Sequence, residues 1–287
     1  MQVPDFSFVN SGIFVGGRGA PVEDKEFIFI AGVNRSGTSL LHEILRKHPQ
    51  ISGFTGTGVP EDEGQHLQSL LGSDLAFGGP GKFAFNDDCY MDESHPLATP
   101  ENARVLFDQW SRYWDLSRKY LIEKSVANVV RSRFLQQLFP KSRFIFLMRH
   151  PLAVAYATRK WVSEIPIMSL TEHSIVACEK MLEDMKFLRS VFILKYEQLV
   201  RDPQEAIDRI FRHLGLESIK VTHAVRADVN EKYFLMWERE RQKLPKDHSD
   251  NTRRKLEFRA NQLGYGIGDY EDLIPVSWLG AHGETAA

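Results

Sequence analysis

Residues 26–49 read EFIFIAGVNRSGTSLLHEILRKHP, and this stretch decides the fold. The apolar run at 27–31 predicts a buried strand, and the apolar spacing at 40–45 predicts a helix. Between them lies a turn with two glycines, at 32 and 37. In a strand–turn–helix unit of this kind, backbone N–H groups and the positive end of the helix dipole converge on an anion. The stretch therefore predicts a cradle for a phosphate-like group.

The cradle departs from the common ATP-binding loop at one position. GVNRSGTS at 32–39 nearly matches the pattern G-x-x-x-x-G-K-S/T, but Thr38 stands where the lysine belongs. A cation is found inside the loop instead, at Arg35. The loop thus predicts binding of a phosphate-like group, but not of ATP in the usual way.

Short apolar runs alternate with helical patterns along the chain. Strands are expected at 27–31, 120–122, 143–148 and 191–194, and helices at 40–47, 102–114, 129–139, 152–161, 170–188 and 204–214. Such alternation predicts an α/β fold in which helices flank both faces of a parallel sheet. Because ligands bind beyond the carboxyl ends of parallel strands, we expect Gly32, Arg149 and Lys195 on one rim.

Length and composition indicate an ordinary globular chain. By length alone, its 287 residues allow one large domain or two small ones with a sizeable core, and 43% hydrophobic and 26% charged residues are ordinary for a soluble chain. We expect a single domain over residues 1–287. A net charge of −2 gives no general attraction to nucleic acid. Two distant cysteines, no secretion signal and no apolar run of about 18 residues favour a cytoplasmic protein without a membrane span. Nothing in the sequence indicates the oligomeric state.

Two regions break the alternation. Residues 52–100 are rich in Gly, Pro, Asp and Glu with little periodicity, which predicts a lid or substrate wall inserted into the domain. A surface insertion without a role is the alternative. Residues 231–259 are dense in Lys, Arg and Glu, which predicts a solvated helix face.

A second anchor for an anion lies at 143–161, RFIFLMRHPLAVAYATRKW. Arg149 follows the expected strand, where its planar fork can bind a second phosphate or pair with an acid. No apolar strand ends in the aspartate with which nucleotide hydrolases hold Mg²⁺. Cations stand near the strand ends instead, so we expect a bound anion to be neutralised by the protein, with no metal.

Three segments in order resemble the sulfotransferase family, which uses 3′-phosphoadenosine 5′-phosphosulfate as donor. They are RSGTS with HPQI, EKSVANVVRSRFLQQLFPKSRFIFLMRHP, and LKYEQLVRDPQEAIDRIFRHLGL, and the resemblance covers about residues 26–216. The particular likeness is to the branch with the tyrosylprotein sulfotransferases and many bacterial enzymes. The implied co-substrate is this phosphosulfate, and the product is 3′-phosphoadenosine 5′-phosphate.

The resemblance also implies roles for single residues. The 5′-phosphosulfate would be bound by Arg35, Ser36, Gly37, Thr38 and Ser39, the 3′-phosphate by Arg149, and the nucleotide also by Tyr196. Lys124 would lie near the transferring sulfuryl group and share the positive charge with Arg35. The family's phosphate-binding serine is replaced here by Ala157, and the adjacent Thr158 is the candidate substitute.

The transfer also needs a base for the acceptor proton. In the similar branch a glutamate follows the cradle helix; VPEDEGQHL at 59–67 offers Glu61, Glu63 and His66. If a helix begins near Pro60, Glu63 and His66 share one face. Glu63 and Glu61 are close candidates and His66 comes next, although acids after Pro60 also simply favour a helix start.

Two other functions fit the same cradle. One is a nucleotide kinase or other phosphotransferase, and the other is a nucleotide-binding protein without turnover. The acceptor is the least determined part. We favour a small molecule or glycan with an apolar portion, because region 52–100 mixes acids with aromatic residues, namely Phe54, Phe77, Phe83, Phe85 and Tyr90.

Overall fold

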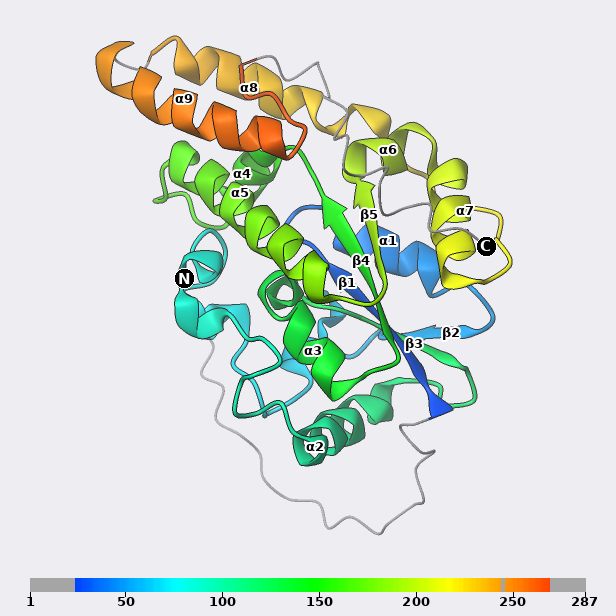
Figure 1. Cartoon of the computed structure of the whole chain (residues 1–287). Helices are drawn as coiled ribbons and strands as arrows, with labels where there is room; N and C mark the ends of the chain where they lie inside the picture. The colour runs from blue at the N-terminus through cyan, green and yellow to red at the C-terminus, as the bar shows by residue number, and fades with distance from the viewer. Residues whose placement is uncertain (1–23, 244–245, 269–287) are drawn as a thin grey trace.

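The centre of the computed structural model is a five-stranded parallel sheet with strand order β2-β3-β1-β4-β5 (Figure 1). The structure describes residues 24–243 and 246–268. The strands are β1 (Glu26–Ala31), β2 (Ile51–Gly53), β3 (Tyr120–Lys124), β4 (Ser142–Met148) and β5 (Val191–Lys195). The predicted α/β fold with a parallel sheet is confirmed.

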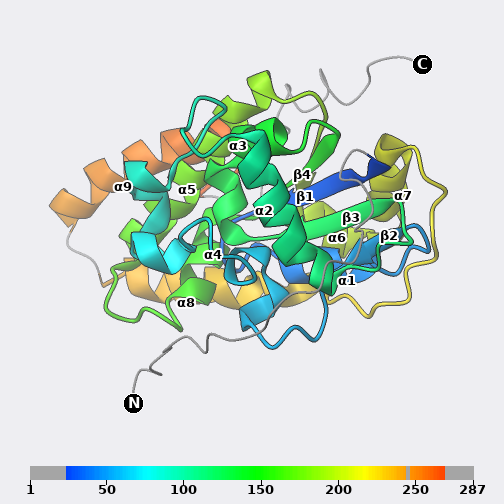
Figure 2. The same cartoon turned by 90° about the horizontal axis from the view of Figure 1, so that it is seen from below.

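Helices cover both faces of the sheet because neighbouring strand residues point to opposite sides. On β1, Phe27 and Phe29 enter one apolar cluster, whereas Ile28 and Ile30 enter the other. The phenylalanine side packs against α2 (Pro100–Trp110), α3 (Ser132–Leu138), α4 (Pro151–Thr158) and α5 (Ile167–Asp184). The isoleucine side packs against α1 (Thr38–Leu45), α6 (Tyr196–Arg201) and α7 (Pro203–Leu214). From below, α2 and α3 lie in front of the strands (Figure 2).

The expected helices are present, with ends set by local chemistry. Proline opens three of them, α2, α4 and α7, where its fixed φ suits the first helical position. Several expected helices are shorter because their ends are 3₁₀ turns, at Ser111–Tyr113, Val126–Val130 and Met185–Phe187. The sequence patterns missed β2 and α6, which have three and six residues and are too short to show a period.

Region 52–100 begins within β2 and continues as a chain of short 3₁₀ turns. They span Pro60–Asp62, Gly64–His66, Asp74–Phe77, Phe83–Phe85 and Asp87–Cys89. The helix expected near Pro60 is wrong, because Glu63 is extended (φ −85°, ψ 131°) and separates the first two turns. Glu61 and Asp62 also have positive φ, of 54° and 50°. Glu63 and His66 therefore do not share a helix face.

The charged region at 231–259 forms α8 (Glu231–Arg241) and most of α9 (Lys246–Gln262). Both helices lie beyond the carboxyl ends of the strands (Figure 1). The expected solvated face is only part of this region, because Tyr233 and Trp237 of α8 and Leu256 of α9 are buried in the core. Over the described ranges, no helix has the length and apolar character needed to cross a bilayer.

Candidate active site

The cradle lies where β1 ends and α1 begins. Gly37 precedes α1 at φ 104°, a left-handed conformation that favours glycine. A Cβ at this position would also lie 2.6 Å from Cδ2 of Tyr196, so the loop can approach that ring only as glycine. Arg35 likewise adopts a left-handed conformation (φ 67°). The loop is thus bent so that the first turn of α1 faces the cavity described below.

Two polar atoms of the cradle have no internal partner. Ser36 is fully buried, and neither its Oγ nor Oδ1 of Asn34 has a hydrogen-bond partner among the described residues. Buried polar groups are normally satisfied, so orphaned ones indicate a missing ligand or water. The start of α1, with unpaired backbone N–H groups, provides further donors for an anion. These features fit a bound phosphate-like group.

Arg149 reaches the cradle from the end of β4. Its Nη1 donates to the backbone carbonyl of Arg35 at 2.7 Å, and its Nε and Nη2 donate to Oδ1 of Asn230 at 2.9 and 2.7 Å. The guanidinium lies over the Tyr196 ring, 4.2 Å from the centroid. Asn230 in turn donates from Nδ2 to Oε1 of Glu197 at 2.8 Å. The structure therefore brings together the two expected residues Arg149 and Tyr196 and adds Asn230, which no sequence pattern had indicated.

Lys124 occupies the lip of the cradle. It comes from the end of β3, which pairs with β1, and its side chain is almost fully buried. Its Nζ donates to Ser39 Oγ at 2.9 Å and to Glu63 Oε1 at 3.3 Å. Ser39 Oγ donates to Glu61 Oε2 at 2.8 Å. Four residues predicted from three separate segments thus form one cluster.

Glu63 has the electrostatics of a base. Its side chain is 8% exposed, and burial, together with the negative charges of Asp74 and Glu123, raises its pKa to about 7 against the attraction of Lys124. A carboxyl with a pKa near the working pH accepts protons efficiently. Its second oxygen, Oε2, accepts a hydrogen bond from Gln65 Nε2 at 2.6 Å.

The other two base candidates lie in different surroundings. Glu61 is 53% exposed, and its carboxylate binds the Ser39 hydroxyl. His66 is half-buried, and burial lowers its pKa, although Asp74 opposes that effect. Its Nε2 lies 3.5 Å from Gln65 Nε2, and it does not line the cavity described below. The three candidates are neighbours, but only the two glutamates line the cavity.

A cavity of about 260 Å³ connects these groups. Its lining, besides the cradle and Leu40, consists of residues from five other segments: Glu61, Glu63, Val126, Arg149, Trp161, Tyr196 and Val229. Trp161 is half-exposed at the end of α4, and the Arg35 guanidinium lies 4.9 Å from its ring centroid. Trp161, at the end of the quoted segment 143–161, and Val229, outside any motif, were not recognised from the sequence as site residues.

Thr158 does not reach this cavity. It is buried in α4, its Oγ1 has no partner among the described residues, and it is absent from the cavity lining. Ala157 is buried beside it. The Thr158 hydroxyl could therefore contact a ligand in the cavity only after a rotation of α4.

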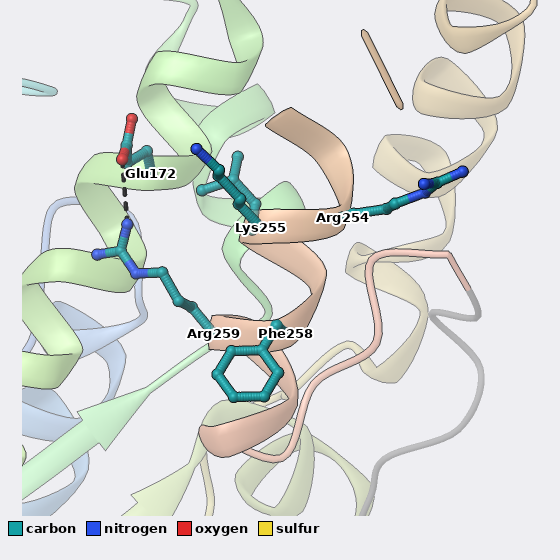
Figure 3. Close-up of a pocket in the computed structure, with 6 residues that line it drawn as sticks. Glu172, Arg254, Lys255, Phe258 and Arg259 are labelled. Atoms are coloured by element: carbon teal, nitrogen blue, oxygen red, sulfur yellow. Dashed lines mark hydrogen bonds and ion pairs between the residues drawn. The ribbon is translucent and has the colours of Figure 1, made fainter. Parts of the chain in front are cut away.

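A second cavity, of about 460 Å³, lies between α5 and α9 and is remote from the cradle (Figure 3). One of the cations that line it, Arg259, already forms ion pairs with Glu172 and Glu179. Arg254 points away from Glu172, toward α8 (Figure 3). We place the site at the smaller cavity because the buried charges and orphaned polar atoms gather there. Within the described ranges, no group of three or more His, Cys, Asp or Glu side chains is arranged to hold a metal ion.

Comparisons with known proteins agree with this geometry. Residues 27–220 match the family model described as the sulfotransferase family. The chain is 25% identical to protein-tyrosine sulfotransferase 2 of Gallus gallus over 202 residues, with 68% of this chain and 52% of that protein covered. It is 24% identical to the omega-hydroxy-beta-dihydromenaquinone-9 sulfotransferase Stf3 of Mycobacterium tuberculosis over 242 residues, with 66% and 62% covered. The chain thus spans about half to three-fifths of the length of these relatives.

Two solved structures have the same fold. The sulfotransferase domain of the Synechococcus olefin synthase superposes with a TM-score of 0.53 at 17% identity, covering 88% of this chain and 100% of that domain. The sulfotransferase domain from the curacin biosynthetic pathway gives 0.50 at 18% identity, covering 85% and 99%.

Proposed function

This chain belongs to the sulfotransferase family, and from its site we propose that it transfers a sulfuryl group from 3′-phosphoadenosine 5′-phosphosulfate to an acceptor hydroxyl or amine. One observation carries the proposal. At the lip of the anion cradle, Lys124 Nζ lies within hydrogen-bond distance of both Ser39 Oγ and Glu63 Oε1. A cation and a carboxyl with a pKa of about 7 thus meet where a transferring group would be held.

The residues that would hold the donor fit an anion with two phosphate positions. The cradle, including Arg35, Ser36, Gly37, Thr38 and Ser39, would bind the 5′-phosphosulfate; the first turn of α1, of which Thr38 and Ser39 line the cavity, supports this assignment. Arg149 would bind the 3′-phosphate, with the Tyr196 ring beneath its guanidinium. Thr158 would contribute only after a rearrangement of α4.

The chemistry follows from the charges of the cluster. The donor would supply a sulfuryl group whose bond to the 5′-phosphate oxygen breaks as the acceptor oxygen or nitrogen bonds to sulfur. Lys124 and Arg35 would stabilise the negative charge that develops on the leaving phosphate. Glu63 would take the acceptor proton. Glu61 would orient Ser39, and His66, which does not line the cavity, is the weakest candidate for the base.

The acceptor side of the cavity is formed by region 52–100, which supports its proposed role as a substrate wall. Glu61 and Glu63 of this region line the cavity together with Trp161, Val126 and Val229. This mixture of carboxylates with apolar surface fits a small molecule or glycan with an apolar portion. The two free cysteines, Cys89 and Cys178, are both buried, in keeping with a reducing compartment such as the cytoplasm.

A thermal-shift titration tests the donor assignment. The probes are 3′-phosphoadenosine 5′-phosphate and ATP, each with and without Mg²⁺. A ligand at 100 times its dissociation constant adds about 2.7 kcal/mol to the free energy of unfolding, which raises the midpoint by several degrees. We expect a metal-independent shift with the bisphosphate and little shift with ATP. A Mg²⁺-dependent shift with ATP alone would instead identify a phosphotransferase.

A further inference from the structure

We propose that Gln65 is a positioning residue for the base. Its side-chain amide lies between the buried carboxyls of Glu63 and Asp74 and holds Glu63 so that Oε1 faces Lys124. The inference rests on the function proposed above, in which Glu63 takes the acceptor proton.

The orientation of the Gln65 amide follows from its partners. Its Oε1 accepts a hydrogen bond from the backbone N–H of Asp74 at 3.1 Å, and a backbone N–H can only donate. The amide nitrogen must therefore face the other way. There it donates to Glu63 Oε2 at 2.6 Å and to Asp74 Oδ1 at 2.9 Å, so both of its N–H groups are used. A flipped amide would place an oxygen against two carboxylates.

The backbone that carries these side chains is fixed from three directions. The N–H of Gly64 donates to Glu123 Oε1 at 3.1 Å, and the N–H of Gln65 donates to Ser125 Oγ at 2.9 Å. The carbonyl of Gly64 accepts from Trp110 Nε1 at 2.9 Å. Any Cβ at position 64 would lie 2.6 Å from Glu123 Oε1, so this approach requires glycine. Glu63 and Gln65 thus leave the chain from a clamped turn.

The two oxygens of Glu63 have different partners. Oε2 accepts a hydrogen bond from the neutral Gln65 amide at 2.6 Å, and Oε1 accepts one from the Lys124 ammonium at 3.3 Å. These two hydrogen bonds fix the orientation of the carboxyl, and Glu63 lines the cavity in that orientation. Gln65 contacts neither the cavity nor the proposed donor residues, so its effect acts through Glu63.

Several charges surround Glu63 and Asp74. Replacement of Gln65 and replacement of Asp74 should therefore shift the Glu63 pKa in opposite directions. Lys124 and Glu123 face Glu63 from β3, and Asp74 faces it from the turn at Asp74–Phe77. Arg131 and His66 act on Asp74. A hydrogen bond from Gln65 favours the ionised form of Glu63, whereas the charge of Asp74 disfavours it. Gln65→Leu should therefore raise the Glu63 pKa, and Asp74→Asn should lower it.

The test is a pH titration of side-chain carboxyls by ¹³C NMR on the full chain, with the Glu63 resonance assigned from Glu63→Gln. The matched control is Gln68→Leu. Gln68 lies in the same loop, and its amide makes three hydrogen bonds to the backbone of Gln65 and Leu71, but none to a carboxyl. We expect Gln65→Leu to raise the Glu63 pKa by about one unit, Asp74→Asn to lower it, and Gln68→Leu to leave it unchanged.

A second readout follows turnover with the phosphosulfate donor and 2-naphthol as a phenolic probe. The acid limb of the pH profile of kcat/KM should move with the Glu63 pKa measured by NMR. The kcat of Gln65→Leu should fall about 100-fold, as expected when a catalytic group is misplaced, and its affinity for the bisphosphate should be unchanged. Equal titrations of wild type and Gln65→Leu, or an equal shift in Gln68→Leu, would overturn the inference. If Gln65→Leu does not fold, an unchanged pKa in Asp74→Asn overturns it. If the wild type neither binds the bisphosphate nor turns over, the proposed function is rejected. The NMR titration would still show whether Gln65 controls the Glu63 pKa.

Discussion

The burial of Glu63 makes the stability of this protein depend on pH in a defined way. A carboxyl whose pKa is raised on folding binds more protons in the folded than in the unfolded state between the two pKa values. For Glu63 these values are about 7 in the folded chain and 4.5 ordinarily. Its contribution to stability is therefore fully favourable below pH 4.5 and is lost as the pH rises toward 7. Glu63→Gln removes this dependence.

The size of the effect follows from the same values. At about 1.4 kcal/mol per pKa unit, the difference between 4.5 and about 7 corresponds to roughly 3 kcal/mol. Solvent screening reduces this figure only slightly, because the Glu63 side chain is only 8% exposed. From pH 4.5 to 8, the stability of wild type relative to Glu63→Gln should thus fall by about 3 kcal/mol.

Urea unfolding of both proteins at half-unit pH steps measures this difference directly. Glu61→Gln is the matched control, because Glu61 lies two residues away and is 53% exposed. The pH dependence that Glu63 causes should remain in Glu61→Gln. Parallel profiles of wild type and Glu63→Gln would refute the reasoning, since they would show that Glu63 titrates alike in both states. The kcat of Glu63→Gln should be about 10²–10⁴-fold below that of wild type, as expected for removal of a general base, and its affinity for the bisphosphate should be unchanged.

Two further substitutions test the supports of the site. Gly64→Ala should lower the free energy of unfolding by about 1–3 kcal/mol in urea unfolding, because its Cβ would lie 2.6 Å from Glu123 Oε1. Gly268→Ala is the control, because Gly268 also lacks a positive φ and its Cβ would lie 3.4 Å from Glu257 Oε2, an ordinary contact. Asn230→Ala should weaken 3′-phosphoadenosine 5′-phosphate about tenfold or more in calorimetry, because Arg149 loses the acceptor of two hydrogen bonds. Unchanged affinity in Asn230→Ala would show that Arg149 is held without it.

The sequence predicted those parts of the fold whose cause is local. The β1–cradle–α1 unit has its signal within 24 residues, because strand period, glycine spacing and helix period are adjacent. Arg149 was found because it directly follows a buried strand, and parallel strands deliver their carboxyl ends to one rim, whereas Lys124 was implied by the family resemblance. The short strand β2 was missed because three residues carry no detectable period.

The errors near the base have a different physical origin. The acids after Pro60 are typical of a helix start, and local propensity alone predicts one. The chain is extended at Glu63 instead, because Gly64 and Gln65 are hydrogen-bonded to Glu123 and Ser125, about 60 residues away. Contacts of this range override local preference, and a single sequence does not show them.

The contact between Asn230 and Arg149 links the segment after residue 220 to the proposed donor site. The family match ends at residue 220, yet Arg149 has one hydrogen bond within the matched region, to the Arg35 carbonyl, and two to Asn230 beyond it. Asn230 and Tyr265 both donate to Glu197, so α8 and the turn after α9 converge on one carboxylate. A buried guanidinium left without these partners would be costly, since unsatisfied charged groups lose more than neutral ones. The segment after residue 220 therefore helps to hold Arg149 where it can bind an anion. Substitutions in this segment should change the affinity for the proposed donor while the structure of the cradle stays the same.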